Sequence, residues 1–199
     1  MSRVAKPMYL SAVFLMLVSM LAFMGVPTAS AKMDNTYGQP VEVATPIQSA
    51  STIAIYDSVI GKEDGANVMY TTLSGDPGVF FVINLDTYEV VRSLPLPGGA
   101  KDTWSHVIAP DGSVYTASMD GRLFRYSPET KEIEDIGVII PGEKAIYGLN
   151  ADEEGNIYGG TYPNAKVWKY DPSANKFTDY GNMYSANDYV RSLAYDHKT

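Results

Sequence analysis

The stretch Gly155-Asn-Ile-Tyr-Gly-Gly-Thr-Tyr-Pro-Asn-Ala-Lys-Val-Trp-Lys-Tyr-Asp-Pro-Ser-Ala-Asn-Lys-Phe-Thr-Asp-Tyr-Gly181 decides the fold of this chain. Apolar and polar residues alternate in it between clusters of turn residues, which predicts three short strands. We place these strands at residues 156–161, 166–170 and 176–180. Asp171-Pro172-Ser173 predicts a turn between the last two, because proline presets φ and an aspartate side chain can cap the turn.

The same pattern recurs upstream with a period of about 44 residues. Four pairs of landmark residues are 44 positions apart: Tyr126 and Tyr170, Pro128 and Pro172, Ile133 and Phe177, and Gly137 and Gly181. Tyrosines that end an apolar pair recur at similar spacing, at Tyr70, Tyr115 and Tyr158. An apolar segment closed by an acidic turn comes before the later copies and again near the C-terminus. One repeat unit therefore contains four strands, and no helical periodicity follows residue 31.

A four-strand repeat of this length is typical of a β-propeller blade. A single four-stranded sheet cannot bury two apolar faces, whereas similar sheets stacked face to face can. We therefore predict an all-β fold, a partial β-propeller of about three and a half four-stranded blades after an N-terminal signal helix. A two-sheet sandwich is the alternative.

Two motifs carry a resemblance to known propellers. The Tyr-Asp-Pro-x-x-x-x-Phe motif at 170–177, after Tyr-Gly-Gly at 158–160, resembles a kelch-type repeat. The Asp-x-x-Gly-x-Ile-Tyr motif at 152–158 is similar to repeats of quinoprotein-like, gluconolactonase-like and related secreted bacterial propellers. The resemblance covers roughly residues 52–199 and implies the propeller fold. Its motifs are structural and shared by many functions.

The number of blades raises the question of ring closure. Propellers usually have four to eight blades, and residues 52–199 supply about three and a half. We expect the chain to be an N-terminal fragment of a longer protein. Alternatively, two copies complete a ring by self-association through the open blade face, since an exposed face and exposed strand edges favour association.

The N-terminus has the features of a secretory signal at residues 1–31. Arg3 and Lys6 precede an apolar run, and Ala-Ser-Ala ends at Ala31, so we expect cleavage before Lys32. An uncleaved membrane anchor is the alternative. Residues 32–51 are polar and predict a linker, and residues 52–199 hold the blades. We expect the protein to be secreted or extracellular, and to contact the membrane only during export. If the leader is uncleaved, we expect the protein at the cell surface.

Composition excludes several classes of function. The chain has 15 Lys and Arg against 23 Asp and Glu, a net charge of -8, which disfavours nucleic-acid binding. It has no cysteine, so thiolate metal sites and cysteine nucleophiles are impossible. No nucleophile elbow, zinc helix or phosphate loop is present. We expect no cofactor and no metal, and we interpret the acidic cluster at 152–154 as a solvated turn.

Candidate catalytic residues come from the first strand of each blade, which lines the central channel of a propeller. These strands contain Trp104, Ser105, His106, Tyr147, Tyr189, Arg191 and Ser192. His106, Tyr147 and Arg191 are weak catalytic candidates: arginine could clamp the carboxylate of an acidic sugar, and histidine or tyrosine could move a proton. This set resembles the one used by propeller-type polysaccharide lyases. In the competing interpretation, His106 donates a hydrogen bond to a backbone carbonyl and the tyrosines pack between blades.

Exposed aromatic residues indicate a binding role. Tyrosine and tryptophan present an apolar face and a polar edge, which match a sugar ring. The ligand-binding candidates are Trp104, Tyr162, Tyr184 and Tyr189. We expect a secreted binding or scaffolding module whose ligand is a carbohydrate or another protein. The alternative is a fragment of a propeller-type polysaccharide lyase or hydrolase that uses the channel histidine, tyrosine and arginine.

Overall fold

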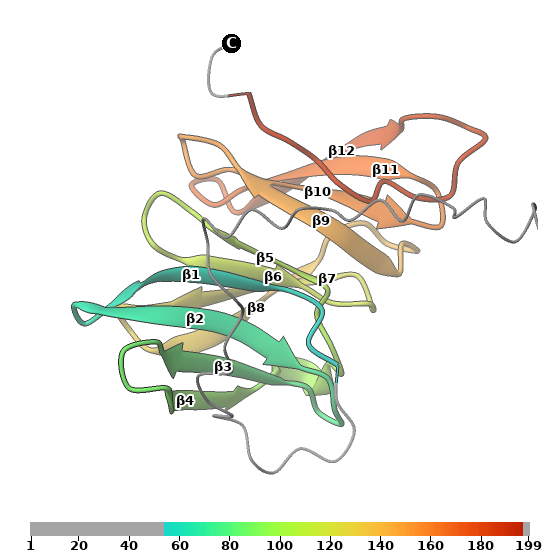
Figure 1. Cartoon of the computed structure of the whole chain (residues 1–199). Helices are drawn as coiled ribbons and strands as arrows, with labels where there is room; N and C mark the ends of the chain where they lie inside the picture. The colour runs from blue at the N-terminus through green and yellow to red at the C-terminus, as the bar shows by residue number, and fades with distance from the viewer. Residues whose placement is uncertain (1–53, 197–199) are drawn as a thin grey trace, which may run out of the picture. The chain divides into compact units, whose positions relative to one another are not determined.

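The computed structural model describes residues 54–196, which form three four-stranded antiparallel sheets (Figure 1). The sheets, here called blades 1, 2 and 3, each follow chain order. Blade 1 consists of β1 (Ser58–Glu63), β2 (Ala66–Leu73), β3 (Val79–Asn84) and β4 (Glu89–Pro95). Blade 2 consists of β5 (Ser105–Ile108), β6 (Val114–Ala117), β7 (Arg122–Ser127) and β8 (Glu132–Val138). Blade 3 consists of β9 (Ala145–Ala151), β10 (Ile157–Tyr162), β11 (Lys166–Asp171) and β12 (Lys176–Asn182).

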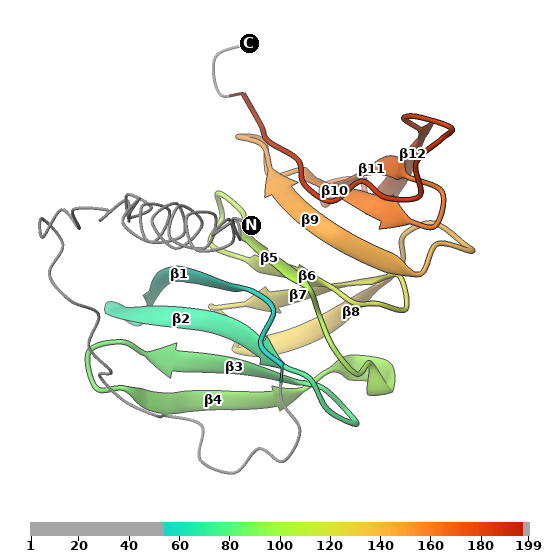
Figure 2. The same ribbon diagram turned by 45° about the vertical axis from the view of Figure 1, so that its right-hand side comes forward.

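The first strands of the three blades are neighbours. β5 contacts both β1 and β9, as Figures 1 and 2 show, so these three are the inner strands. A short 3-10 turn, η2 (Pro97–Gly99), lies in the connection from blade 1 to blade 2. The prediction of an all-β partial propeller is confirmed. A two-sheet sandwich does not fit three sheets joined through successive inner strands.

Apolar side chains that alternate along the strands fill the two spaces between blades. The cluster between blades 1 and 2 contains Val68, Tyr70, Phe80, Phe124 and Tyr126. Another cluster joins blades 2 and 3 and contains Tyr115, Leu123, Ile157, Trp168 and Tyr170. Trp168 is fully buried, and its indole fills the space in which a side chain at Gly159 would lie. Several tyrosine and phenylalanine landmarks of the repeat therefore pack between blades.

The antiparallel topology gives the blades two distinct ends. One end, here called the turn end, has the connections β1–β2, β3–β4, β5–β6, β7–β8, β9–β10 and β11–β12. The opposite end, here called the loop end, has the connections β2–β3, β4–β5, β6–β7, β8–β9 and β10–β11, and the segment that follows β12. Each inner strand begins at the loop end, because β1, β5 and β9 all run from the loop end toward the turn end.

Residues 189–196, expected to begin a fourth blade, form no strand. They run beside blade 3: the Val190 amide donates to the Thr161 carbonyl at 3.2 Å, and the Asn150 side-chain amide donates to the Leu193 carbonyl at 3.4 Å. The predicted signal peptide (1–31) and linker (32–51) lie outside the described residues. Within residues 54–196, no helix is long and apolar enough to cross a membrane.

Candidate functional site

Five aromatic side chains lie in contact across the loop end of all three blades. We call them the aromatic row, and they are Tyr56, Trp104, Tyr147, Tyr189 and Tyr162. Tyr56 stacks on Trp104 with ring centroids 4.5 Å apart, and Tyr162 stacks on Tyr189 at 4.6 Å. Tyr147 connects the two stacks through edge contacts, at 5.3 Å from Trp104 and 5.4 Å from Tyr189. The row is therefore continuous.

Four members of the aromatic row occupy equivalent places in the repeat. Tyr56 and Trp104 directly precede the paired parts of β1 and β5, Tyr147 lies near the start of β9, and Tyr189 lies in the segment beside blade 3. Their positions follow the repeat period closely, at separations of 48, 43 and 42 residues. An aromatic residue at the start of each inner strand was the signal that could have revealed Tyr56, which sequence reasoning missed.

The aromatic row is partly open to solvent and carries one cation. Tyr56 is 48% exposed and Tyr189 is 40% exposed, while Trp104, Tyr147 and Tyr162 are half-buried. The Arg191 guanidinium lies 5.0 Å from the centroid of the Tyr147 ring and 5.3 Å from that of Tyr189. Both distances are within the range of a cation–π contact. Burial among these groups, together with neighbouring Tyr162 and Tyr147, raises the pKa of Tyr189, so its hydroxyl stays protonated.

A hollow of about 390 Å³ lies beside the aromatic row, at the start of the inner strands. Tyr56, Trp104 and Tyr147 line it together with Ser105 and Ser192. Among the described residues, neither the buried Trp104 Nε1 nor the buried Ser105 Oγ has a hydrogen-bond partner. Ser105 is only 6% exposed. Buried polar atoms are normally satisfied by protein or water, so among the described residues the Trp104 N–H is an unused donor and the Ser105 hydroxyl an unused donor and acceptor.

His106 also borders this hollow, but its ring lies within the interface between blades 1 and 2. The side chain is fully buried, its centroid lies 6.4 Å from that of Phe80, and its Nε2 is 3.1 Å from the Thr72 hydroxyl. Nδ1 lies 3.5 Å from the Asp57 carboxylate, which also accepts the His106 backbone amide at 2.6 Å. Of the three catalytic candidates, the structure brings together Tyr147 and Arg191 and separates the His106 ring from solvent.

Asp57 is the acidic residue of the hollow, and it is already engaged. Burial by itself raises the pKa of this carboxyl, but hydrogen bonds from the side chain and backbone of His106 outweigh burial, and the pKa lies below its usual value. Asp57 is therefore ionised at neutral pH. Its hydrogen bonds hold the entry to β1 against β5 and fix the position of Tyr56, the preceding residue.

The loop 162–165 carries Tyr162 and is held by a buried acid. Glu143 is 5% exposed and accepts hydrogen bonds from the Thr161 hydroxyl at 2.7 Å and the Asn164 side-chain amide at 2.7 Å. These hydrogen bonds hold the loop in place. Tyr184, the remaining ligand-binding candidate, is 63% exposed and makes no ring contact with the aromatic row.

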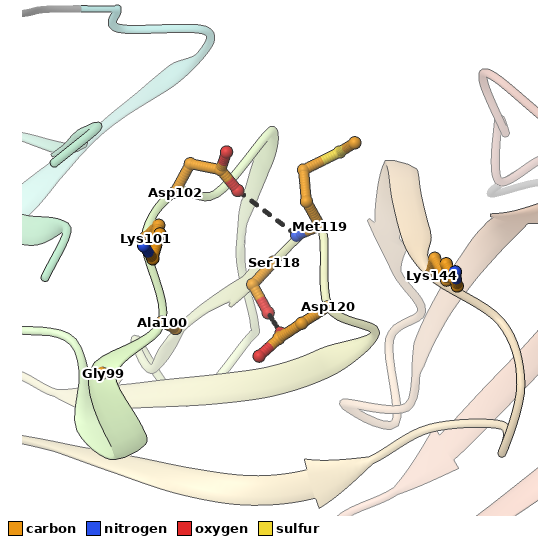
Figure 3. Close-up of a pocket in the computed structure, with 8 residues that line it drawn as sticks. All are labelled: Gly99, Ala100, Lys101, Asp102, Ser118, Met119, Asp120 and Lys144. Carbon is orange, nitrogen blue, oxygen red and sulfur yellow. Dashed lines mark hydrogen bonds between the residues drawn. The ribbon is translucent and has the colours of Figure 1, made fainter. Parts of the chain in front are cut away.

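A second hollow of about 560 Å³ lies at the loop end, away from the aromatic rings (Figure 3). Lys101 and Lys144 lie on opposite sides of it, and the Asp102 carboxylate accepts the Met119 amide at 3.4 Å. Asp120 accepts a hydrogen bond from Ser118 on its floor. The Lys101 ammonium pairs with the exposed Asp76 at 2.6 Å. The carboxylates of Asp102 and Asp120 thus accept hydrogen bonds from other residues that line this hollow.

No protein-family model matches the sequence, and a search of curated proteins finds no match. Solved structures match in fold. Selenomethionine-substituted virginiamycin B lyase from Staphylococcus aureus is 19% identical with a TM-score of 0.55, over 66% of this chain and 42% of that one. The WD40 repeats of RRP9 are 12% identical with a TM-score of 0.58, over 72% of this chain and 42% of that one.

A third similar structure is the extracellular domain of BT3049 from B. thetaiotaomicron. It is 18% identical with a TM-score of 0.51, over 69% of this chain and 19% of that chain. This chain thus spans less than half the length of the structures it matches. At such identities the likeness shows the fold alone, and that fold is the β-propeller.

Proposed function

We propose that this chain is a secreted β-propeller binding module whose aromatic row binds carbohydrate. The observation that carries the proposal is the continuity of the row. Aromatic residues scattered singly over a surface need no special explanation, whereas a contiguous patch of exposed apolar surface marks an interaction site. Here two exposed tyrosines are joined by three half-buried rings, beside a hollow with unpaired polar atoms.

Sugar chemistry matches this combination. The carbon-bound hydrogens of a pyranose form an apolar face that stacks on an aromatic ring, while its hydroxyls both donate and accept hydrogen bonds. The aromatic row supplies rings with apolar faces and polar edges. Trp104 Nε1 supplies a donor, and Ser105 Oγ supplies a donor and an acceptor. A ligand with only apolar atoms would leave these polar atoms without hydrogen bonds, which lowers the affinity.

A propeller enzyme acting on polysaccharide is a second candidate, favoured by the contact between Arg191 and Tyr147. Two of the similar structures are named as virginiamycin B and streptogramin B lyases, but their likeness is one of fold. The burial of the His106 ring leaves the tyrosine as the remaining proton-transfer candidate of the set. The binding function requires no such group, so it is the conclusion that the geometry supports best.

A glycan array followed by isothermal titration calorimetry tests the proposal. We expect the purified protein to bind at least one class of polysaccharide. We expect Tyr147→Ala to weaken binding about tenfold, since loss of an aromatic contact costs about 0.5–1.5 kcal/mol in addition to the lost buried area. Tyr180→Ala is the matched control, because Tyr180 is 53% exposed and lies in β12 outside the row. If the protein binds no glycan on the array and captures another protein instead, the carbohydrate proposal would be overturned in favour of a protein ligand.

A further inference from the structure

Arg191 is a cation without an acidic partner in the described structure. It is exposed, and within residues 54–196 it forms no ion pair. Its contacts are the two rings of Tyr147 and Tyr189. Contact with the two neighbouring rings limits the rotation of the guanidinium without using its five N–H donors, so the donors stay available.

The other arginines of the described chain differ in this respect. Arg92 pairs with Glu63 at 3.0 Å, Arg122 pairs with Asp135, and Arg125 lies 3.5 Å from Asp111. Each of these ion pairs joins neighbouring parts of the fold. Arg191 is thus the one arginine in residues 54–196 that forms no ion pair with another residue of this range, and it lies on the aromatic row.

The hollow beside the row places further donors near this cation. Trp104 Nε1 has no partner within residues 54–196, and neither has the hydroxyl of Ser105, a residue that is more than nine-tenths buried. Both residues line the same hollow as Tyr147, over which Arg191 lies. A ligand that stacks on the row while presenting acceptor oxygens can therefore meet the exposed guanidinium over Tyr147 and Tyr189.

We propose that the ligand is an acidic polysaccharide, whose sugar carboxylate forms a two-point contact with the Arg191 guanidinium while its ring lies on the aromatic row. This inference rests on the proposed carbohydrate binding and adds the class of sugar to it. Guanidinium and carboxylate match in geometry through two parallel N–H···O bonds. A neutral sugar would leave the arginine without a counter-charge.

Two acidic residues lie near the proposed contact. Asp57 borders the hollow, but its carboxylate is held by the backbone and ring of His106. Asp188 is exposed and precedes Tyr189 in the same segment. Repulsion between an exposed carboxylate and a ligand carboxylate is weak in water and is further screened by salt, whereas the guanidinium contact is short-ranged. Salt also screens the repulsion between an acidic ligand and the net charge of -8 on the chain.

The experiment compares matched acidic and neutral ligands. Isothermal titration calorimetry would measure binding of polygalacturonate and alginate, and of fully methyl-esterified polygalacturonate and dextran as neutral probes. We expect the acidic polymers to bind at least about tenfold more tightly, because a hydrogen bond to a charged group contributes more than a neutral one. We expect Arg191→Gln to abolish this preference and Arg191→Lys to restore part of it, since lysine keeps the charge but loses the planar fork.

Lys144→Gln and Lys101→Gln are the controls for an alternative anion site in the hollow of Figure 3. Both lysines are exposed, as is Arg191, so all three variants should fold, which the thermal unfolding midpoint would verify. If acidic and neutral polymers bind equally, the inference is overturned and the proposed function stands. If the lysine variants lose the preference and Arg191→Gln keeps it, the assignment to Arg191 is overturned. If none of the polymers binds and the glycan array is silent, both proposals are overturned.

Discussion

The two ends of the blades differ in how their polar groups are satisfied. At the turn end, acidic side chains bond to the fold itself. The Asp152 carboxylate accepts the Asn156 backbone amide at 2.7 Å and the Tyr158 hydroxyl at 3.0 Å. The Glu63 carboxylate accepts hydrogen bonds from Tyr126 at 2.9 Å, Arg92 at 3.0 Å and Lys131 at 2.9 Å.

At the loop end, aromatic rings are exposed and several donors are free. Arg191 contacts rings and forms no ion pair in the described chain, and Trp104 Nε1 and Ser105 Oγ have no partner there. The contrast assigns the charged groups of the turn end to stability, and the ligand site that we propose lies at the loop end. Substitutions of Glu63 and Asp152 should therefore change stability without changing affinity, and substitutions in the aromatic row or at Arg191 should do the reverse.

Among substitutions of the charged groups at the turn end, the largest effect on stability is expected from Glu63→Gln. The residue is 6% exposed, and its loss of charge leaves Arg92 and Lys131 without their shared partner. Removal of one member of a fully buried pair costs about 3–5 kcal/mol. Because the two cations are about a quarter exposed, we expect a smaller loss here, about 2–3 kcal/mol. Urea denaturation measures the change. A loss below about 0.5 kcal/mol, typical of a surface substitution, would contradict the assignment.

Acid sensitivity follows from the same carboxylate. Burial alone would raise the Glu63 pKa, but hydrogen bonds from Lys131, Arg92 and Tyr126 outweigh it and lower the pKa below 4.5. A carboxyl whose pKa is lower in the folded state contributes stability above its unfolded pKa, and this contribution is lost as the pH falls through the folded pKa. We expect the unfolding free energy to fall below about pH 5, and to fall less steeply in Glu63→Gln. Parallel curves for the two proteins would show that other groups carry the acid sensitivity.

A smaller loss of stability is expected from Asp152→Ala. Sequence reasoning interpreted this aspartate as part of a solvated turn, but it is 5% exposed, because it accepts hydrogen bonds from both the turn and Tyr158. Removal should cost about 1–2 kcal/mol, since it leaves the half-buried donors of Asn156 and Tyr158 without their acceptor. Glu154→Ala, in the same turn and exposed, is the control and should change stability by less than about 0.5 kcal/mol. Equal effects of the two substitutions would contradict a special role for Asp152.

The smallest loss of global stability is expected at the loop end, from Gly160→Ala. A methyl group at this position would collide with the backbone carbonyl and side chain of Val190 and displace the segment that carries Tyr189 and Arg191. Because this segment is mostly exposed, we expect the unfolding free energy to change by less than about 1 kcal/mol. Ligand affinity should nevertheless be lost, and limited proteolysis should cleave faster within 183–196. Unchanged affinity would show that this segment does not form part of the site.

The sequence predicted the strands closely because the period-two pattern is local. The strands expected at 166–170 and 176–180 are observed as Lys166–Asp171 and Lys176–Asn182. The landmark pair Tyr126 and Tyr170 also occupies equivalent strands, β7 and β11. Repeats make such predictions robust, since each copy tests the alignment of the others.

The candidate site was predictable in part. Trp104, Tyr162 and Tyr189 were expected as ligand residues, and the structure brings these three together through Tyr147. The burial of the His106 ring could not be derived, because it depends on Thr72 and Phe80 of another blade. The role of Glu63 was missed for the same reason, since its partners Arg92, Tyr126 and Lys131 come from distant positions in the chain.

The most direct test of the loop-end site measures affinity and stability of one variant together. Trp104→Ala removes a central ring of the aromatic row and the unpaired Nε1 donor at once. We expect calorimetry of Trp104→Ala to show at least about a tenfold loss of affinity for the polysaccharide identified on the array. Trp168→Ala is the contrasting variant: Trp168 is fully buried, so its removal should cost about 3–5 kcal/mol of stability. Undiminished affinity in a folded Trp104→Ala protein would contradict the account.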